Sequence, residues 1–276
     1  MKKRAVSVVV LIALMSVCLF ACRQTRILFF MTAGILCAIE FCRNLKKLDI
    51  HCISWIMIAY LAGQAALTMF SFSSDAGCIL FLCCVYAAGI TGLFCKQVAG
   101  KGMLATLAGL IYPCLLFGTL IVIVGNDMWL EVLSLACVAT WICDSFAMFG
   151  GRRFGKHKIA PNISPNKTAE GCICGAISSL FAGLIVWMLG IVFGGELLGY
   201  SYISIPLWQC ELIVFIASTM GQLGDLVESM LKRMIGVKDF SQLIPGHGGM
   251  LDRADSLMFS IPTAYALISL LGFITV

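Results

Sequence analysis

The chain alternates long apolar runs with short polar breaks almost from end to end. A helix that crosses the hydrocarbon core of a bilayer needs about 20 mostly apolar residues, and most of the runs approach that length. The pattern predicts nine helices, over residues 5–22, 27–42, 53–72, 78–95, 103–125, 130–151, 172–194, 207–231 and 254–275. The second run is short and ends near Glu40, so a tilted or re-entrant segment is the alternative there.

The composition also indicates a protein that folds in a membrane. Of the 276 residues 61% are hydrophobic and 12% are charged, and the mean hydropathy is +1.00, which excludes a water-soluble globular protein. We therefore predict an all-α, polytopic membrane protein with a single membrane domain over residues 1–276. Acidic residues near or inside the apolar runs concentrate in the second half. Residues 1–125 are expected to be N-terminal helices, and residues 126–276 are expected to form the catalytic half.

The placement of basic residues predicts the orientation in the membrane. Lys and Arg accumulate in cytoplasmic loops, and with a cytoplasmic N-terminus every Lys and Arg except Arg23 and Arg26 falls on the inner side. We expect a multi-pass protein of the cell (inner or plasma) membrane with its active site facing the cytoplasm. The net charge of +5 is explained by this topology beside the lipid bilayer, so it requires no nucleic acid as a partner.

Two further patterns have simpler interpretations. The stretch that ends at Cys22 resembles a signal peptide, and cleavage is the alternative, but the charge pattern favours its retention as a first helix. Most of the 15 cysteines lie within the apolar runs and lack the paired spacing of a zinc site. We interpret them as small buried hydrophobic residues.

A first group of candidate site residues surrounds the loop after the sixth predicted helix. Asp144 lies about two turns before the inner end of that helix, where a carboxylate must face other helices or water. The loop GGRRFGKHK, residues 150–158, follows with glycines and cations that suit an anion such as phosphate. Ser164 and Pro165 then predict a helix start, where Lys167 and Thr168 could contact phosphate. A basic membrane anchor and an ordinary helix cap are the alternatives.

A second group is the polar face at the inner end of the eighth predicted helix, GQLGDLVESMLKR. Asp225, Glu228, Ser229 and Lys232 fall at i, i+3, i+4 and i+7, which places them on one side of the helix. Such a face does not contact lipid. It indicates either a functional site or a network of ion pairs that closes the helix bundle, and intramembrane carboxylates favour the site.

The segment IPGHGGMLDRAD, residues 244–255, follows and interrupts the helical pattern. Its proline and glycines prevent a regular helix, and Asp252 and Asp255 would open the ninth helix. Asp252 as an N-cap with Asp255 three residues later is the structural alternative. If Asp225 and Asp252 instead share a divalent cation, most plausibly Mg²⁺, the nearby Lys and Arg residues fit phosphoryl or nucleotidyl transfer.

These motifs bring one family into view. Residues 229–255, SMLKRMIGVKDFSQLIPGHGGMLDRAD, resemble the signature of the phosphatidate cytidylyltransferases, S-x-x-K-R followed by K-D and H-G-G-x-x-D-R-x-D. Residues 149–171 are similar to the upstream motif of that family, and the nine-helix layout is similar to its architecture. The resemblance is detailed over about the last half of the chain and only topological over the first four helices.

The resemblance implies a reaction between CTP and phosphatidic acid that gives CDP-diacylglycerol and pyrophosphate. It implies Mg²⁺ as cofactor, with a second cation as an option, and it suggests a homodimer. The metal-binding acids of the family fall on Asp225 and Asp252, which with Lys232, Ser229 and His247 make up the expected catalytic set. Expected substrate-binding residues are Asp144, Lys167, Thr168, Glu170, Arg233, Lys238, Asp239, Arg253 and Asp255.

The sequence departs from the family pattern at two positions. Ala254 is smaller than the usual aliphatic residue, and Asn166 replaces a common lysine, so we expect these departures to affect nucleotide affinity and not the type of reaction. Two other functions remain as alternatives. A CTP-dependent lipid-alcohol kinase, of the dolichol or phytol type, shares a related upstream motif, and a transporter would use the intramembrane acids as an ion pathway.

Overall fold

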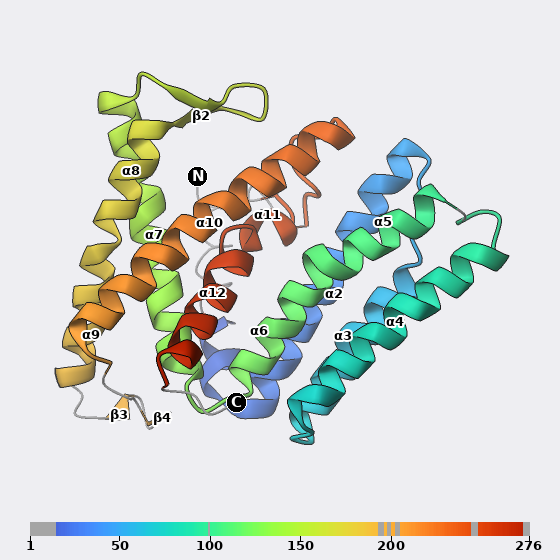
Figure 1. The fold of residues 1–276 in the computed structure, drawn as a ribbon, viewed down its shortest axis with the longest axis horizontal. Coiled ribbons are helices and arrows are strands. Elements are labelled where there is room, and N and C mark those ends of the chain that lie inside the picture. The colour runs from blue at the N-terminus through green and yellow to red at the C-terminus, as the bar shows by residue number, and fades with distance from the viewer. Residues whose placement is uncertain are drawn as a thin grey trace. The chain divides into compact units, whose positions relative to one another are not determined.

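The computed structural model describes residues 15–98, 100–192, 196–197, 200–201, 205–243 and 248–272, most of which are helical (Figure 1). In the first predicted helix, 5–22, residues 15–20 are helical, residues 21–22 are not, and residues 5–14 lie outside the described residues. The longer elements before the midpoint are α2 (Arg23–Leu45), η1 (Lys46–Leu48), α3 (Ser54–Met69), α4 (Ser74–Phe94), α5 (Lys101–Gly109), η2 (Leu110–Leu115) and α6 (Leu116–Val124). Those that follow are α7 (Trp129–Phe154), β1 (Lys158–Ala160), β2 (Ser164–Thr168), α8 (Ala169–Ser178), α9 (Leu180–Val192), β3 (Glu196–Leu197), β4 (Tyr200–Ser201), α10 (Leu207–Ile235), α11 (Leu251–Ala254) and α12 (Leu257–Leu270).

Six helical stretches in the described part of the chain are long and apolar enough to cross a membrane. They are Arg23–Leu48, Asp75–Phe94, Lys101–Val124, Trp129–Phe154, Ala169–Val192 and Leu207–Ile235. α3 is apolar but shorter. Large apolar side chains remain exposed along these helices, as in α4, where lipid would cover them. The all-α polytopic fold is confirmed, and the number of nine helices is not.

The chain divides into two compact units, each built from two separate parts of the sequence. The first unit combines Met1–Gly125 with Ile235–Ala254, and the second combines Asn126–Met234 with Asp255–Val276. Both units therefore contain residues from the predicted catalytic half, because the segment 235–254 belongs with the N-terminal helices.

In the first unit, α2 packs against α3 and α6, and α3 packs against α4 (Figure 1). α2 is longer than the predicted helix 27–42, since it begins with two arginines that bind the ends of its neighbours. Arg23 Nε donates to the carbonyl of Gly125 at 2.8 Å, and Arg26 Nε donates to that of Val124 at 3.1 Å. These carbonyls end α6, where a cation stabilises the negative end of the helix dipole. The two basic residues outside the charge pattern thus have a structural role.

One predicted span of the first unit is not a regular α-helix. The run 103–125 consists of α5 and α6 joined by the π-helical turn η2, which contains Pro113. Proline lacks an N–H and clashes with the carbonyl four residues earlier, so a wider turn accommodates it.

In the second unit, α7 packs closely against α8, and α9 and α12 also pack against α7. Glycines bring α7 and α8 together. A Cβ on Gly171 would lie 2.7 Å from the carbonyl oxygen of Ala147, and one on Gly175 would lie 2.7 Å from that of Cys143. The close approach places the start of α8, and the strand before it, beside the C-terminal end of α7.

The predicted helix start at Ser164 in this unit is wrong. Residues 164–168 form the strand β2, which pairs antiparallel with β1, rather than a helix begun by Ser164 and Pro165. The helix starts at Ala169, with Thr168 as the N-cap that accepts from the Gly171 N–H at 3.2 Å. The strand prevails because its backbone finds partners in β1, which local capping signals do not reveal.

The predicted ninth helix, residues 254–275, is also divided. α11 ends at Ala254, and a turn at Asp255 and Ser256 precedes α12. Asp252 is the second residue of α11, so the predicted alternative of an N-cap at Asp252 with Asp255 in the same first turn is wrong.

Candidate active site in the second unit

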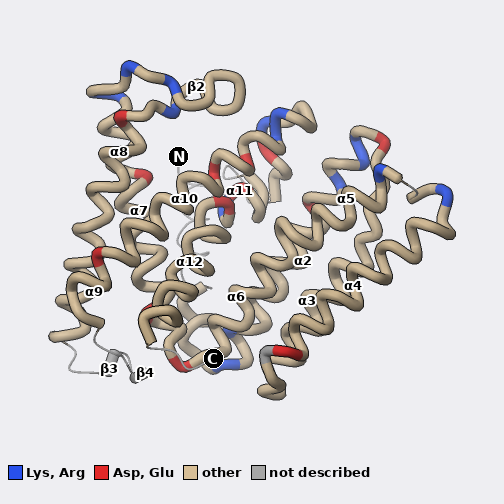
Figure 2. The backbone as a smooth tube through the Cα atoms, in the orientation of Figure 1, with Lys and Arg blue, Asp and Glu red and all other residues tan. Residues whose placement is uncertain are grey.

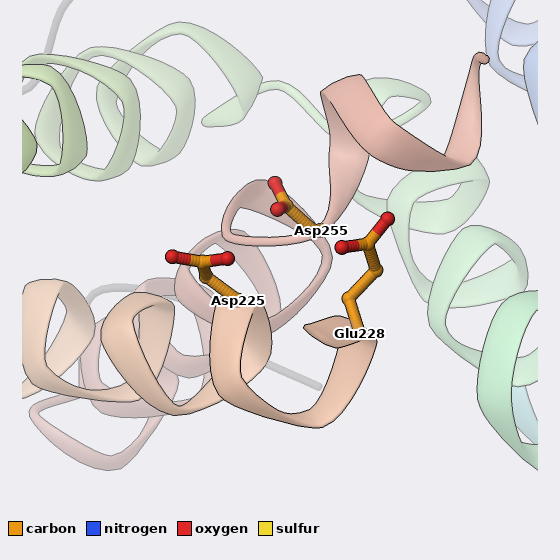
Figure 3. A group of neighbouring side chains, drawn as sticks. All are labelled: Asp225, Glu228 and Asp255. Atoms are coloured by element: carbon orange, nitrogen blue, oxygen red, sulfur yellow. The ribbon is translucent and has the colours of Figure 1, made fainter. Parts of the chain in front are cut away.

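Three carboxylates meet in the second unit. Asp225 and Glu228 project from one face of α10, as their spacing predicts, and Asp255 projects from the turn before α12 (Figure 3). One ligand oxygen from each lies within 4.8 Å of the other two. Glu228 is fully buried, with 0% of its surface exposed. Three carboxylates at this spacing repel one another unless positive charge lies between or beside them.

Two lysines supply part of that charge. Lys167 of β2 places Nζ 2.6 Å from Oδ2 of Asp225 and donates to the carbonyl of Gln222 at 3.1 Å. Lys232, one turn along α10, forms an ion pair with Glu228. Asp255, outside the candidate spans, has its pKa raised to about 6 because burial disfavours the charged form and the Asp225 carboxylate lies close. The charged form of Asp255 is therefore disfavoured at this position.

A cavity of about 650 Å³ opens beside the three carboxylates and shares Asp225 with them. Its wall combines acidic and basic side chains from three elements: Asp144 and Arg152 from α7, Lys158 from β1, and Lys167 from β2. Figure 2 shows that Lys and Arg gather on the β1–β2 hairpin and the adjoining end of α7, whereas the rest of α7 to α9 carries few charges. This arrangement suits a polyanionic ligand bound together with a cation.

Hydrogen bonds hold the hairpin that carries Lys167 at its base and at its turn. The Glu170 carboxylate accepts from the backbone N–H of Lys156 at 3.0 Å and of His157 at 3.2 Å, and it lies 2.6 Å from Nδ1 of His157. Arg233 Nε, on α10, donates to the carbonyl of Ile163 at 3.2 Å. Glu170 and Arg233, predicted to bind substrate, are thus engaged with the hairpin in this structure.

The other predicted residues fall into three groups. Ser229 Oγ lies 3.5 Å from Oδ1 of Asp225, and Asp144, Lys167 and Thr168 line the cavity. Lys238, Asp239 and Arg253 are exposed in the first unit. His247 lies outside the described residues.

Asp252, the second predicted metal ligand, is only 8% exposed and belongs to the first unit. Its Oδ2 atom accepts from the backbone N–H of Phe240 at 2.9 Å and of Gly249 at 2.8 Å. A carboxylate that accepts hydrogen bonds from two backbone amides is held in a fixed orientation. Its role as a metal ligand stays a prediction.

Sequence reasoning underrated Glu228 and placed Asp255 among the substrate-binding residues. The signal for Glu228 was present, because it lies three residues after Asp225 on the same helical face. Asp255 joins them through the turn after α11, and no periodicity in the sequence reports such a turn.

The fold and the site together describe a polytopic membrane protein with a carboxylate cluster beside a charged cavity. Comparison with known proteins identifies the group to which it belongs. A profile of the Cytidylyltransferase family matches residues 2–271, so the chain belongs to this family.

Individual relatives resemble part of the chain. It is 46% identical over 133 residues to a phosphatidate cytidylyltransferase of Staphylococcus saprophyticus, across 48% of this chain and 47% of the relative. It is 44% identical over 161 residues to a phosphatidate cytidylyltransferase of Bacillus subtilis, across 58% and 56%. The same name belongs to a Staphylococcus haemolyticus relative, 44% identical over 133 residues. The chain thus spans about half the length of the curated relatives it matches.

Proposed function

We propose that this protein transfers CMP from CTP to phosphatidic acid, giving CDP-diacylglycerol and pyrophosphate. The observation that carries the proposal is the carboxylate cluster of Asp225, Glu228 and Asp255 at the edge of a cavity lined by Lys and Arg. Membership of the Cytidylyltransferase family and the names of the relatives favour a cytidylyl transfer over the lipid-alcohol kinase and the transporter.

The cluster fits a hard divalent cation. Its donors are carboxylate oxygens, the type that Mg²⁺ prefers, and they converge within 4.8 Å. Burial and the nearby Asp225 carboxylate raise the pKa of Asp255, so a bound cation would favour the charged form of its carboxyl. When bound, Mg²⁺ would neutralise charge that develops on the phosphate groups. We expect Asp225, Glu228 and Asp255 to hold it. The role of Asp252 as a metal ligand and a second cation stay predictions.

The cavity fits the nucleotide. Its volume of about 650 Å³ lies in the range of ~300–1,000 Å³ that is common for small-molecule sites. Arg152, Lys158 and Lys167 offer cations to the triphosphate, and Thr168 adds a hydroxyl. Lys167 and Asp225 both line the cavity, so the ammonium group of Lys167 can pass from the carboxylate to a phosphate oxygen when CTP enters.

The chemistry asks little of the protein beyond positioning and charge neutralisation. A phosphate oxygen of phosphatidic acid is already ionised at neutral pH, so the attack needs no general base. This oxygen forms a bond to the α-phosphorus of CTP, and the bond from that phosphorus to the bridging oxygen breaks, so pyrophosphate leaves. Lys167 and Arg152 would stabilise the negative charge on the departing group.

The location of the site follows the same reasoning. CTP is a cytoplasmic solute, whereas phosphatidic acid resides in the bilayer, so the two meet at the inner membrane face. The basic residues around the cavity belong to the segments that the positive-inside rule assigns to the cytoplasm. We therefore place the site on the cytoplasmic face of the plasma membrane; the homodimer stays a prediction.

An experiment with labelled CTP tests the proposal. The purified full-length protein in detergent receives Mg²⁺, phosphatidic acid and CTP labelled with ³²P at the α-phosphate. A cytidylyltransferase leaves the label in the lipid as CDP-diacylglycerol and releases pyrophosphate. A lipid-alcohol kinase would leave the α-label in free CDP and use a lipid alcohol instead. Absence of labelled CDP-diacylglycerol and of pyrophosphate from a folded preparation would refute the proposal.

A further inference from the structure

Glu40, an acidic residue of the first unit, is far in sequence from the residues of the proposed active site. Glu40 is in α2, within the candidate membrane span Arg23–Leu48, and only 5% of its surface is exposed. A carboxylate buried in a membrane helix is costly unless strong donors surround it. Its partners therefore indicate what it is for.

Among the described residues, three donors bind the Glu40 carboxylate, and all come from the stretch between the end of α10 and the first residue of α11. Oε1 accepts from the hydroxyl of Ser241 at 2.5 Å and from the N–H of Met250 at 3.0 Å. Oε2 accepts from the N–H of Leu251 at 2.9 Å. Hydrogen bonds to an ionised acceptor are about twice as strong as neutral ones. Glu40 thus fixes the backbone at the first residue of α11.

The fit between Glu40 and this segment is close. A Cβ built on Gly249 would lie 2.7 Å from Oε2 and 2.8 Å from Oε1 of Glu40, so any larger residue there would displace the carboxylate. One turn further along α2, Asn44 Nδ2 donates to the carbonyl of Phe240 at 2.6 Å. α2 therefore binds this part of the chain at two places, at Phe240 and at Leu251.

The second predicted metal ligand lies directly after this part of the chain. Asp252 follows Leu251 directly, and its Oδ2 atom depends on the N–H groups of Phe240 and Gly249 for its orientation. If the start of α11 moves, the backbone that bears Asp252 moves with it.

We propose that Glu40 is a positioning residue for Asp252, and that it acts through the backbone N–H groups of Met250 and Leu251. Its contribution is to hold the backbone at the start of α11 in one place, so that the Asp252 carboxylate keeps a fixed orientation in which it can bind a divalent cation. This inference rests on the proposed function for the identity of the cation but not for the contacts themselves.

The test compares Glu40→Gln with the wild type in the full-length protein. Glutamine keeps the shape but loses the charge and presents an N–H₂ group toward an N–H donor. Thr32→Val on the same helix is the matched control, because the Thr32 hydroxyl donates back to the carbonyl of Leu28 within α2. Gly249→Ala is a second variant that disturbs the same contact from the opposite side.

The first readout needs no turnover. Binding of Mn²⁺ to the nucleotide-free protein, followed by electron paramagnetic resonance, is expected to weaken about 10- to 100-fold in Glu40→Gln, as for other residues that orient metal ligands. Hydrogen exchange in peptides that cover residues 248–255 is expected to accelerate in both variants and to stay at the wild-type rate in Thr32→Val. The combined Glu40→Gln and Gly249→Ala variant should lose less than the sum of the single effects, because both disrupt one contact.

The second readout separates positioning from general damage. With CTP and phosphatidic acid, Glu40→Gln should lower kcat and raise the Mg²⁺ requirement, while KM for CTP and the thermal midpoint stay close to the wild type. Unchanged Mn²⁺ affinity and unchanged exchange at residues 248–255 would overturn the proposal. The proposal would also be overturned if KM for CTP rose and the thermal midpoint fell together, with no selective change in the Mg²⁺ requirement. If the wild type binds Mn²⁺ but makes no CDP-diacylglycerol, the proposed function fails while the positioning role is still measured.

Discussion

Lys167 occupies a place where a bound cation and an ammonium group compete for the same carboxylate. Its Nζ atom lies 2.6 Å from Oδ2 of Asp225, with 21% and 33% of the two side chains exposed. We predict that Lys167→Gln has two opposite effects. The protein without nucleotide binds a divalent cation more tightly, because the competing charge is gone, while turnover falls, because the triphosphate loses a cationic partner.

The geometry sets the size of the first effect. Two unit charges 2.6 Å apart attract by about 6 kcal/mol at an effective dielectric constant of about 20. Hydration of the ammonium and the entropy of two long side chains offset most of this, which leaves about 1 to 1.5 kcal/mol for a partly exposed pair. Mn²⁺ should therefore bind about five- to tenfold more tightly to the variant. Loss of one donor to the reacting phosphates should reduce kcat by about 100-fold or more.

The assay is a Mn²⁺ titration by electron paramagnetic resonance, paired with turnover of α-labelled CTP. Lys158→Gln is the control, since Lys158 lines the same cavity and forms no ion pair with a cluster carboxylate among the described residues. It should reduce turnover and leave Mn²⁺ affinity unchanged. A Lys167→Gln variant that binds Mn²⁺ equally or more weakly would refute the reasoning, because Lys167 would then not compete for Asp225.

Three further predictions concern the acids and the packing beneath them. Asp225→Asn and Asp252→Asn should each nearly abolish turnover while circular dichroism and the thermal midpoint stay unchanged; near-normal activity would remove that residue from the metal site. Because the pKa of Asp255 is raised to about 6, its carboxyl is neutral below that pH and charged above it, so Mn²⁺ affinity should fall as the pH drops through 6. An Asp255→Asn variant should lose this dependence. Gly171→Ala should lower stability by about 1 to 3 kcal/mol, because the added methyl would meet the α7 backbone at 2.7 Å, and a lowered thermal midpoint checks it. Gly89→Ala, where a Cβ would meet nothing within 4 Å, should leave the midpoint unchanged or raise it.

Periodicity predicted those features of the site that lie on one helix. The spacing of Asp225, Glu228, Ser229 and Lys232 placed them on one face of α10, and the structure shows the ion pair between Glu228 and Lys232 that this spacing allows. The same reasoning also predicted the apolar helices and their approximate order, because a membrane span is a local property of about 20 residues.

Features that depend on distant partners could not be predicted in this way. Ser164 and Pro165 carry the same signals at a helix start and at a strand, and only the pairing with β1 decides between them. Asp255 enters the carboxylate cluster because a turn separates α11 from α12. From the sequence, Glu40 indicated only that the second helix was short. The structure shows that its carboxylate has hydrogen-bond donors near residue 250.

The contact between Glu40 and Leu251 joins residues 211 positions apart in the chain. During synthesis, α2 is complete long before Met250 and Leu251 are made. The Glu40 carboxylate therefore has no access to these donors when α2 first enters the membrane. The first unit cannot be completed until residues 235–254 have been synthesised. An N-terminal fragment that ends at Gly125 would carry Glu40 without these partners. Co-expression of the remaining residues should therefore increase the amount of that fragment that accumulates in cells.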